Sequence, residues 1–168
     1  MRAPSVALLA ALLAGGCYDV AGLNGTPIMQ PGQDCMKCHT AGGQASGHQF
    51  TVAGTIFAGP DSPLDAGVQD AEVLIVDAAG TKLTLLTNQV GNFYTSEVLK
   101  PPIHIDVQWG DHRMRMVEPP PAPDGGLITP VSCNLCHAYP TPLKAPVGGF
   151  SPAPGRIFVP GDTPVVQP

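Results

Sequence analysis

A five-residue pattern, Cys-x-x-Cys-His, occurs twice in this chain and constrains its fold more than any other feature. The first copy lies in DCMKCHT (34–40) and the second in SCNLCHA (132–138). Four of the five cysteines belong to these two copies. Any fold must therefore place one short cysteine-containing turn at each end of the region that connects the two motifs.

This pattern is the attachment signature of c-type haem. Two thiols add across the two vinyl groups at the edge of a porphyrin, and two intervening residues let one tight turn span them. The adjacent histidine is then held under the ring, where it ligates the iron. The sequence therefore predicts two covalently bound c-type haems. Their thioether cysteines would be Cys35, Cys38, Cys133 and Cys136, and their proximal iron ligands His39 and His137.

Two other interpretations use the same cysteines. Four thiolates in two pairs can bind structural zinc in a tetrahedral site. Cysteines of an exported protein can also pair as disulfides. Neither interpretation explains the histidine after each pair, so the pattern favours haem. A thioredoxin-like redox pair would need a βαβ context, which the sequence does not indicate.

The first residues have the features of an export signal. Residues 1–16 combine Arg2 with an apolar run that is too short to span a bilayer. The small residues before Cys17 resemble a bacterial lipoprotein signal, which implies that Cys17 is lipidated and becomes the mature N-terminus. We expect an exported protein anchored at the periplasmic or outer-membrane surface of a Gram-negative bacterium. Ordinary secretion, with Cys17 as a lone thiol, is the alternative.

The region between the two motifs predicts a small β-domain. With 20 Gly, 20 Pro and only 12% charged residues, the chain is unsuited to a long helical bundle. We expect a mainly β fold, a small antiparallel β-sandwich flanked by irregular Gly/Pro-rich haem-binding segments. Runs of β-branched or alternating residues bounded by turn residues predict strands within 50–57, 71–77, 81–87 and 88–97.

The stretch IHIDVQWGDHRMRMV (103–117) predicts a β-hairpin that turns at 110–111. One face of this hairpin would be largely apolar, and the other would place opposite charges across from each other. The register pairs Ile105 with Met116, Asp106 with Arg115, Val107 with Met114, Gln108 with Arg113, and Trp109 with His112.

The strand-and-turn pattern VAGTIF…AEVLIVDAAG…GNFY resembles carboxypeptidase regulatory-like modules, which are small transthyretin-like β-sandwiches. The resemblance implies a spacer or docking role and no catalysis. The chain as a whole is similar to small dihaem c-type cytochrome lipoproteins. Its expected parts are a signal peptide (1–16), a first haem-binding segment (17–49), the sandwich (50–117), and a Pro-rich second haem-binding segment with a tail (118–168).

The sixth coordination position of each iron needs a further ligand. His48 is the favoured distal ligand of the first haem, because it follows His39 in a Gly-rich loop that can fold back over the ring. Met36 lies inside the first motif and is poorly placed to reach the iron. Further candidates on the hairpin are His104, His112, Met114 and Met116, although core packing is the alternative for the two methionines. Arg156 is a candidate partner for a haem propionate.

The remaining pattern favours an electron carrier over an enzyme. The net charge of -5 provides no basic surface for nucleic acid. No nucleophile–base pair or phosphate-binding loop is visible. We expect other redox proteins or cytochromes as partners, and a membrane reached through the lipid anchor. The alternatives are a haem-based sensor or small redox enzyme with one open iron position, and a surface adaptor with structural haems.

Overall fold

The computed structural model describes residues 25–116, 129–137 and 155–159. The predicted signal peptide and Cys17 lie outside these ranges. Within them, no helix is both long enough and apolar enough to cross a bilayer.

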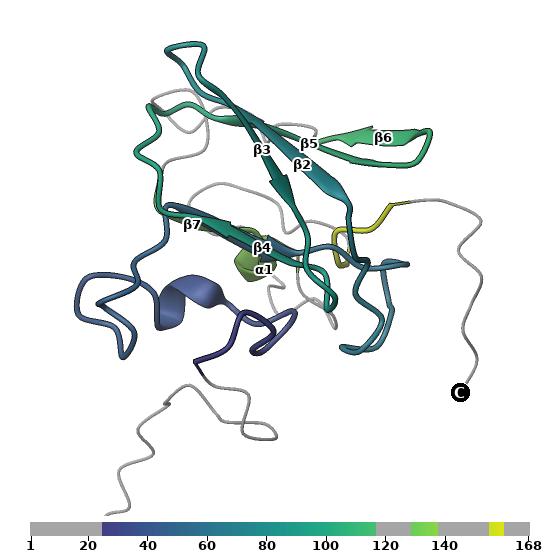
Figure 1. The fold of residues 1–168 in the computed structure, drawn as a ribbon, viewed down its shortest axis with the longest axis horizontal. Helices are drawn as coiled ribbons and strands as arrows, with labels where there is room; N and C mark the ends of the chain where they lie inside the picture. Colours follow the sequence, from purple (N-terminus) through teal and green to yellow (C-terminus); the bar gives the residue numbers. More distant parts are fainter. Residues whose placement is uncertain (1–24, 117–128, 138–154, 160–168) are drawn as a thin grey trace, which may run out of the picture.

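Two β-sheets form the body of the fold (Figure 1). The four-stranded sheet has the order β3-β2-β5-β6, and the three-stranded sheet has the order β4-β1-β7. The first contains β2 (Glu72–Val76), β3 (Lys82–Leu86), β5 (His104–Trp109) and β6 (His112–Arg115). The second contains β1 (Val52–Thr55), β4 (Asn92–Thr95) and β7 (Val131–Ser132). The prediction of a mainly β fold is confirmed.

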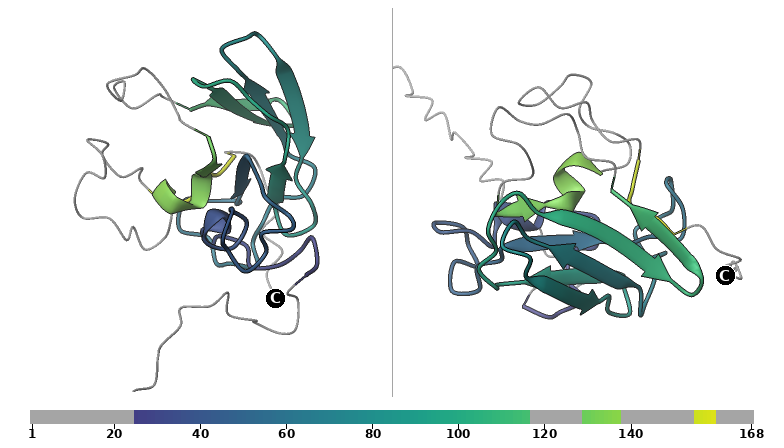
Figure 2. Two further views of the ribbon diagram at one scale, coloured as in Figure 1. Left: turned by 90° about the vertical axis from the view of Figure 1, so that its left-hand side faces the viewer. Right: turned by 90° about the horizontal axis from the view of Figure 1, so that it is seen from above.

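Two very short helices carry the two cysteine motifs. The 3-10 helix η1 (Cys35–Lys37) holds the first, and α1 (Cys133–Cys136) holds the second. In both views of Figure 2, the light green α1 lies close to the blue segment that contains η1. Both helices contact β1, so the three-stranded sheet positions the two motifs.

Alternation of apolar residues along the strands builds the core between the two sheets. On β2, Val73 and Ile75 are fully buried, while the neighbouring Glu72 is exposed. A side chain of a strand points to the face opposite that of its neighbour, so every second residue enters the core. The other sheet contributes Val52 and Phe93, and β5 contributes Ile105 and Val107.

The β5–β6 hairpin has the predicted register, with Asp106 opposite Arg115 and Trp109 opposite His112. Asp106 is buried and accepts hydrogen bonds from both arginines of β6. Arg115 Nε lies 3.3 Å from Oδ1, and Arg113 Nε lies 3.1 Å from Oδ2. Arg113 thus reaches diagonally beyond Gln108, its partner in the register, because a long side chain spans to the next residue on the same face.

The three-stranded sheet also recruits chain from beyond the predicted sandwich. β7 lies at the end of a Pro-rich stretch that the sequence predicted to be a linker, and it pairs parallel with β1. Further on, the backbone N–H of Phe57 donates to the carbonyl of Ile157 at 2.8 Å. Both additions are too short to show a strand periodicity, and they are ordered by pairing with β1 and Phe57.

Asp77 ties two loops together at the end of β2. Its Oδ1 accepts the backbone N–H groups of Ala79 at 2.9 Å and Thr81 at 2.7 Å. Its Oδ2 accepts the N–H of Lys100 at 3.0 Å. These hydrogen bonds favour the ionised form, so they lower the pKa of the Asp77 carboxyl, with Lys100 contributing most.

We predict that Asp77→Asn destabilises the fold at neutral pH and matters less in acid. The lowered pKa means that the folded state binds fewer protons than the unfolded chain, so the contribution of Asp77 is present above its ordinary pKa of about 3.8. That contribution is lost as the pH falls through the lower folded-state pKa. Urea denaturation at neutral and acid pH measures the difference, with Asp111→Asn on an exposed turn as control. If the difference in free energy of unfolding between variant and wild type were the same at all pH values, this account would be contradicted.

Candidate haem-binding site

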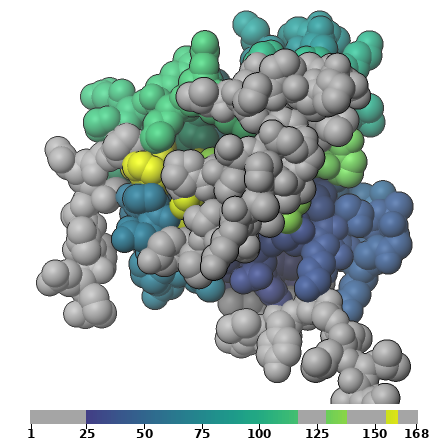
Figure 3. All heavy atoms as spheres, turned by 180° about the vertical axis from the view of Figure 1, so that it is seen from behind, coloured from purple at the N-terminus to yellow at the C-terminus, as the bar shows by residue number. Residues whose placement is uncertain are grey.

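The two Cys-x-x-Cys-His motifs lie side by side although they are far apart in sequence. The backbone N–H of Cys35 donates to Ser132 Oγ at 3.2 Å. Asn134 Nδ2 donates to the carbonyl of Gln33 at 2.9 Å. From behind, the light green surface of 129–137 borders the blue surface of the first motif's segment (Figure 3). The parallel β1–β7 pair explains this proximity, because β7 leads directly into α1.

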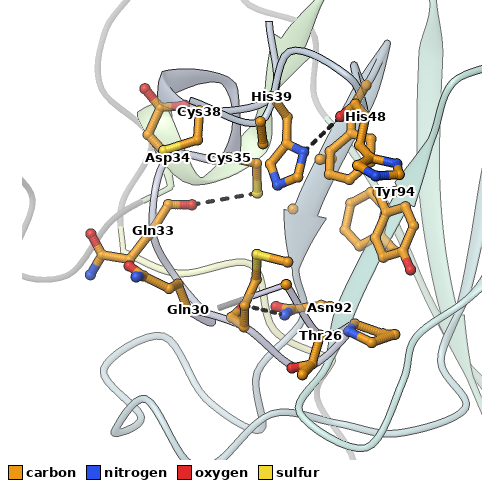
Figure 4. A pocket seen from close by; sticks show the side chains of 18 of the residues that line it. Thr26, Gln30, Gln33, Asp34, Cys35, Cys38, His39, His48, Asn92 and Tyr94 are labelled. Atoms are coloured by element: carbon orange, nitrogen blue, oxygen red, sulfur yellow. Dashed lines mark hydrogen bonds between the residues drawn. The ribbon is translucent and has the colours of Figure 1, made fainter. Parts of the chain in front are cut away.

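A cavity of about 430 Å³ opens beside the first motif (Figure 4). This volume lies within the range of small-molecule and cofactor pockets, about 300–1,000 Å³. Its wall contains all three functional residues of the motif, Cys35, Cys38 and His39. The rest of the wall comes from the preceding segment, from the following loop, and from β1 and β4.

A hydrogen bond to the backbone fixes the ring of His39. Its Nδ1 lies 2.7 Å from the backbone carbonyl oxygen of His48, and the residue is only 7% exposed. Since a carbonyl only accepts, Nδ1 carries a proton in this hydrogen bond, and in the corresponding neutral tautomer the lone pair is on Nε2. Figure 4 shows the ring pointing into the cavity. Metal-ligating histidines commonly donate their second ring nitrogen to such a carbonyl.

Aromatic rings support His39 from one side. The ring of Phe50 stacks on His39 with a centroid distance of 4.0 Å, and Tyr94 stacks on Phe50 at 4.6 Å. Phe50 follows the loop and Tyr94 lies on β4, so the ring of His39 is fixed against the three-stranded sheet.

The Gly-rich loop after His39 closes tightly on the motif. The N–H of Phe50 donates to the carbonyl of His39 at 3.0 Å, and that of Ala45 donates to the carbonyl of Cys38 at 3.0 Å. A Cβ on Gly43 would lie 2.2 Å from the Cys38 oxygen, so only glycine fits there.

His48, the predicted distal ligand, contacts the ring of His39 through its backbone. Its carbonyl oxygen contacts Nδ1 of His39, whereas the other ring nitrogen, Nε2, faces the cavity. Its side chain borders the cavity but is exposed. The arrangement gives His48 a backbone role in orienting His39, and ligation by its side chain stays a prediction.

The described cysteines differ in state and burial. Cys38 is disulfide-bonded, whereas Cys35, Cys133 and Cys136 are free thiols. Burial, with a smaller effect of Asp34, raises the pKa of Cys35 to about 11. Burial also raises the pKa of Cys133 to about 12. Among the described residues, no group of three or more His, Cys, Asp or Glu side chains lies close enough together to hold a metal ion.

The second motif is anchored through Cys133. This residue packs against β1, where a Cβ on Gly54 would lie only 2.8 Å from the Cβ of Cys133. Glycine at this position of β1 therefore admits the second motif to the sheet. The ring of His137 hydrogen-bonds the backbone of Gly155. Burial lowers the pKa of His137, and the bond to Gly155 partly offsets it, which favours the neutral ring that binds metals.

The other sequence candidates lie away from the described cavity. The hairpin residues His104, His112, Met114 and Met116 are absent from its lining, and Met116 packs against the core. Arg156, predicted as a propionate partner, is buried with its guanidinium 4.5 Å from the centroid of the Phe57 ring. Arg156 directly follows Gly155, the residue bonded to His137, so it lies close to the second motif.

Most of the cavity wall outside the motif and His48 was not predicted from the sequence, and this part includes Met29 and Asn92. Met29 lies in a Gly- and Pro-containing stretch without periodicity. The available signal was a methionine a short distance before Cys35, in a chain with only 5 Met.

Comparison with protein-family models, curated proteins and solved structures found no match to this chain.

A buried polar network joins the second motif to β1 and to the first motif. Asn134, which is 3% exposed, accepts the N–H of Thr55 at 3.1 Å. Its Nδ2 donates to Thr55 Oγ1 at 3.0 Å as well as to Gln33. One side chain inside the second motif therefore satisfies backbone groups of both β1 and the first motif's segment.

We predict that Asn134→Ala lowers the free energy of unfolding by about 1–3 kcal/mol, because it leaves the buried N–H of Thr55 without its acceptor. Leu135→Ala is the matched control, since Leu135 is the other intervening residue of the same motif and is 48% exposed. That control should change stability by less than about 0.5 kcal/mol. Denaturant titration measures both, and equal losses in the two variants would contradict the proposed anchoring.

Proposed function

We propose that this protein is a dihaem c-type cytochrome that carries electrons. The observation that supports this best is the hydrogen bond from His39 Nδ1 to the His48 carbonyl at 2.7 Å. It leaves Nε2 as the free ligand nitrogen in a cavity whose wall includes both cysteines of the same motif. Such orientation of a histidine between a carbonyl and a cofactor cavity is typical of iron and zinc ligands.

The chain's own groups would attach and orient each haem. Each motif cysteine would supply an S–H that adds across a vinyl group, forming a C–S bond while the hydrogen goes to the other vinyl carbon, with no net electron exchange. Because Cys38 is disulfide-bonded in the structure, an external dithiol reductant would first have to open that disulfide by thiol exchange. When bound, haem supplies an iron that cycles between two oxidation states.

The position of the motifs suits transfer between two haems and onward to a partner. Direct contact between the segments of the two motifs, from Cys35 to Ser132, supports short distances between the groups they would hold. The stack of His39, Phe50 and Tyr94 lies along the wall of the cavity, and Tyr94 at its end is 42% exposed. Other redox proteins or cytochromes are the proposed partners. The sandwich, similar in its sequence to carboxypeptidase regulatory-like modules, would serve as spacer or docking unit.

The disulfide at Cys38 supports a second candidate function. In that case Cys38 forms a structural disulfide in an exported binding protein without haem, and the other three motif cysteines remain free thiols. A haem-based sensor or redox enzyme differs from both in needing one five-coordinate iron. Spin state and haem content of the purified protein distinguish the three.

We predict two covalent haems per chain in protein made in a host that attaches c-type haem. Thioether bonds survive unfolding, so the haem stain should persist on a denaturing gel. The double variant Cys133→Ala/Cys136→Ala should keep one haem, and Cys35→Ala/Cys38→Ala should keep the other. Pyridine haemochrome spectra and intact mass give the count. A count of zero, with the mass of a disulfide-bonded chain, would favour the second candidate.

The proposed location is the periplasmic or outer-membrane surface, with Cys17 as lipid anchor. We predict that Cys17→Ser moves the protein from the membrane fraction to the soluble fraction, because one acylated cysteine supplies the attachment. Mass spectrometry of the wild-type N-terminus provides the independent check. An unmodified Cys17, or cleavage at another position, would overturn the assignment.

A further inference from the structure

We infer that Met29 is the distal ligand of the iron whose proximal ligand is His39. This inference rests on the proposed haem attachment, and it assigns the sixth coordination position to a residue outside both motifs. Its grounds are the position of Met29 in the cavity wall, the fixation of its backbone, and the chemistry of its thioether.

Met29 belongs to the wall that faces His39. Figure 4 shows His39 and Cys35 on one side of the cavity, and Thr26, Gln30 and Asn92 across from them. Met29 lies between Thr26 and Gln30 in sequence and lines the same cavity. A flat ring bound by Cys35 and ligated by His39 would therefore present its opposite face to the segment of Met29.

The backbone of Met29 is held on both of its polar groups. Its carbonyl accepts Asn92 Nδ2 at 2.8 Å, and its N–H donates to the carbonyl of Thr26 at 3.2 Å. Because Asn92 lies on β4, the methionine segment is tied to the same sheet that supports the proximal side. This fixation reduces the entropy that ligation would otherwise cost.

The same contacts connect Met29 to the second motif. Thr55 Oγ1 donates to Asn92 Oδ1 at 2.8 Å, and the N–H of Thr55 donates to Asn134. Asn134 and Thr55 are 3% and 1% exposed, so their end of this chain of hydrogen bonds is shielded from water, while Asn92 is half-buried. Asn92 is thus a positioning residue that places the Met29 segment relative to both motifs.

The chemistry of the wall distinguishes Met29 from its neighbours. Its thioether is a soft, uncharged ligand of the kind that c-type cytochromes use beside histidine. It is the only methionine of the described lining. His48, the other plausible ligand there, is held on the proximal side by its carbonyl.

The test uses the haem-loaded full chain and the variant Met29→Leu, which keeps an apolar side chain of similar volume. Wild type should show a thioether-to-iron charge-transfer band in the oxidised state. The variant should lose that band, convert one haem from low to high spin, and bind one more carbon monoxide per chain than wild type. Met36→Leu is the matched control, since Met36 lies in the first motif but not in the cavity lining, and it should match wild type.

Two further arms separate the possible outcomes. Met29→His should restore the low-spin state but without the thioether band and with a lower reduction potential, which a merely structural role of Met29 would not produce. His48→Ala should leave the band in place. If Met29→Leu carries two haems and keeps all wild-type spectra, the ligand inference is wrong while the cytochrome proposal stands. If wild type carries no haem, the cytochrome proposal itself fails.

Discussion

The pair of hydrogen bonds between Thr55 and Asn134 is the contact on which the arrangement of the two motifs depends. Thr55 ends β1, and Asn134 lies between the two cysteines of the second motif. Among the described residues, α1 is also attached to the sheet through β7, which leads into it, and through the packing of Cys133 on Gly54. A strand that pairs on both edges and binds a helix at its end can hold two distant segments of a small chain together.

A polar anchor of this kind adds directional contacts to the apolar core between the two sheets. A buried amide stabilises a fold only when its donors and acceptors are all engaged, since each unmet group carries its full desolvation cost. Asn134 meets this condition with its contacts to Thr55 and Gln33. The directional bonds also define one position for the motif, which apolar packing alone would specify less strictly.

The sequence predicted those parts of the fold in which several residues repeat one signal. The hairpin register followed from alternation and a Gly-Asp turn, and it is correct. β7 could not be predicted, because two residues show no period and their pairing with β1 is decided by tertiary contact. The residues of the candidate site likewise fall into a part that the sequence predicts and a part that it does not. The motif residues follow from spacing, whereas the cavity wall around Met29 depends on which loop β4 holds through Asn92.

The hydrogen bond that orients His39 is made to the chain's own backbone, so under the proposed function the histidine would be oriented toward the cavity by the polypeptide itself. Such preorganisation lowers the entropy cost of binding. Cys38, in contrast, is not ready for attachment. It is disulfide-bonded and would have to be reduced before it could form a thioether. In an oxidising compartment, disulfide formation competes with haem attachment for the same thiol. If haem is attached as proposed, the first motif combines a histidine already oriented toward the cavity with a cysteine whose redox state would decide whether attachment can proceed.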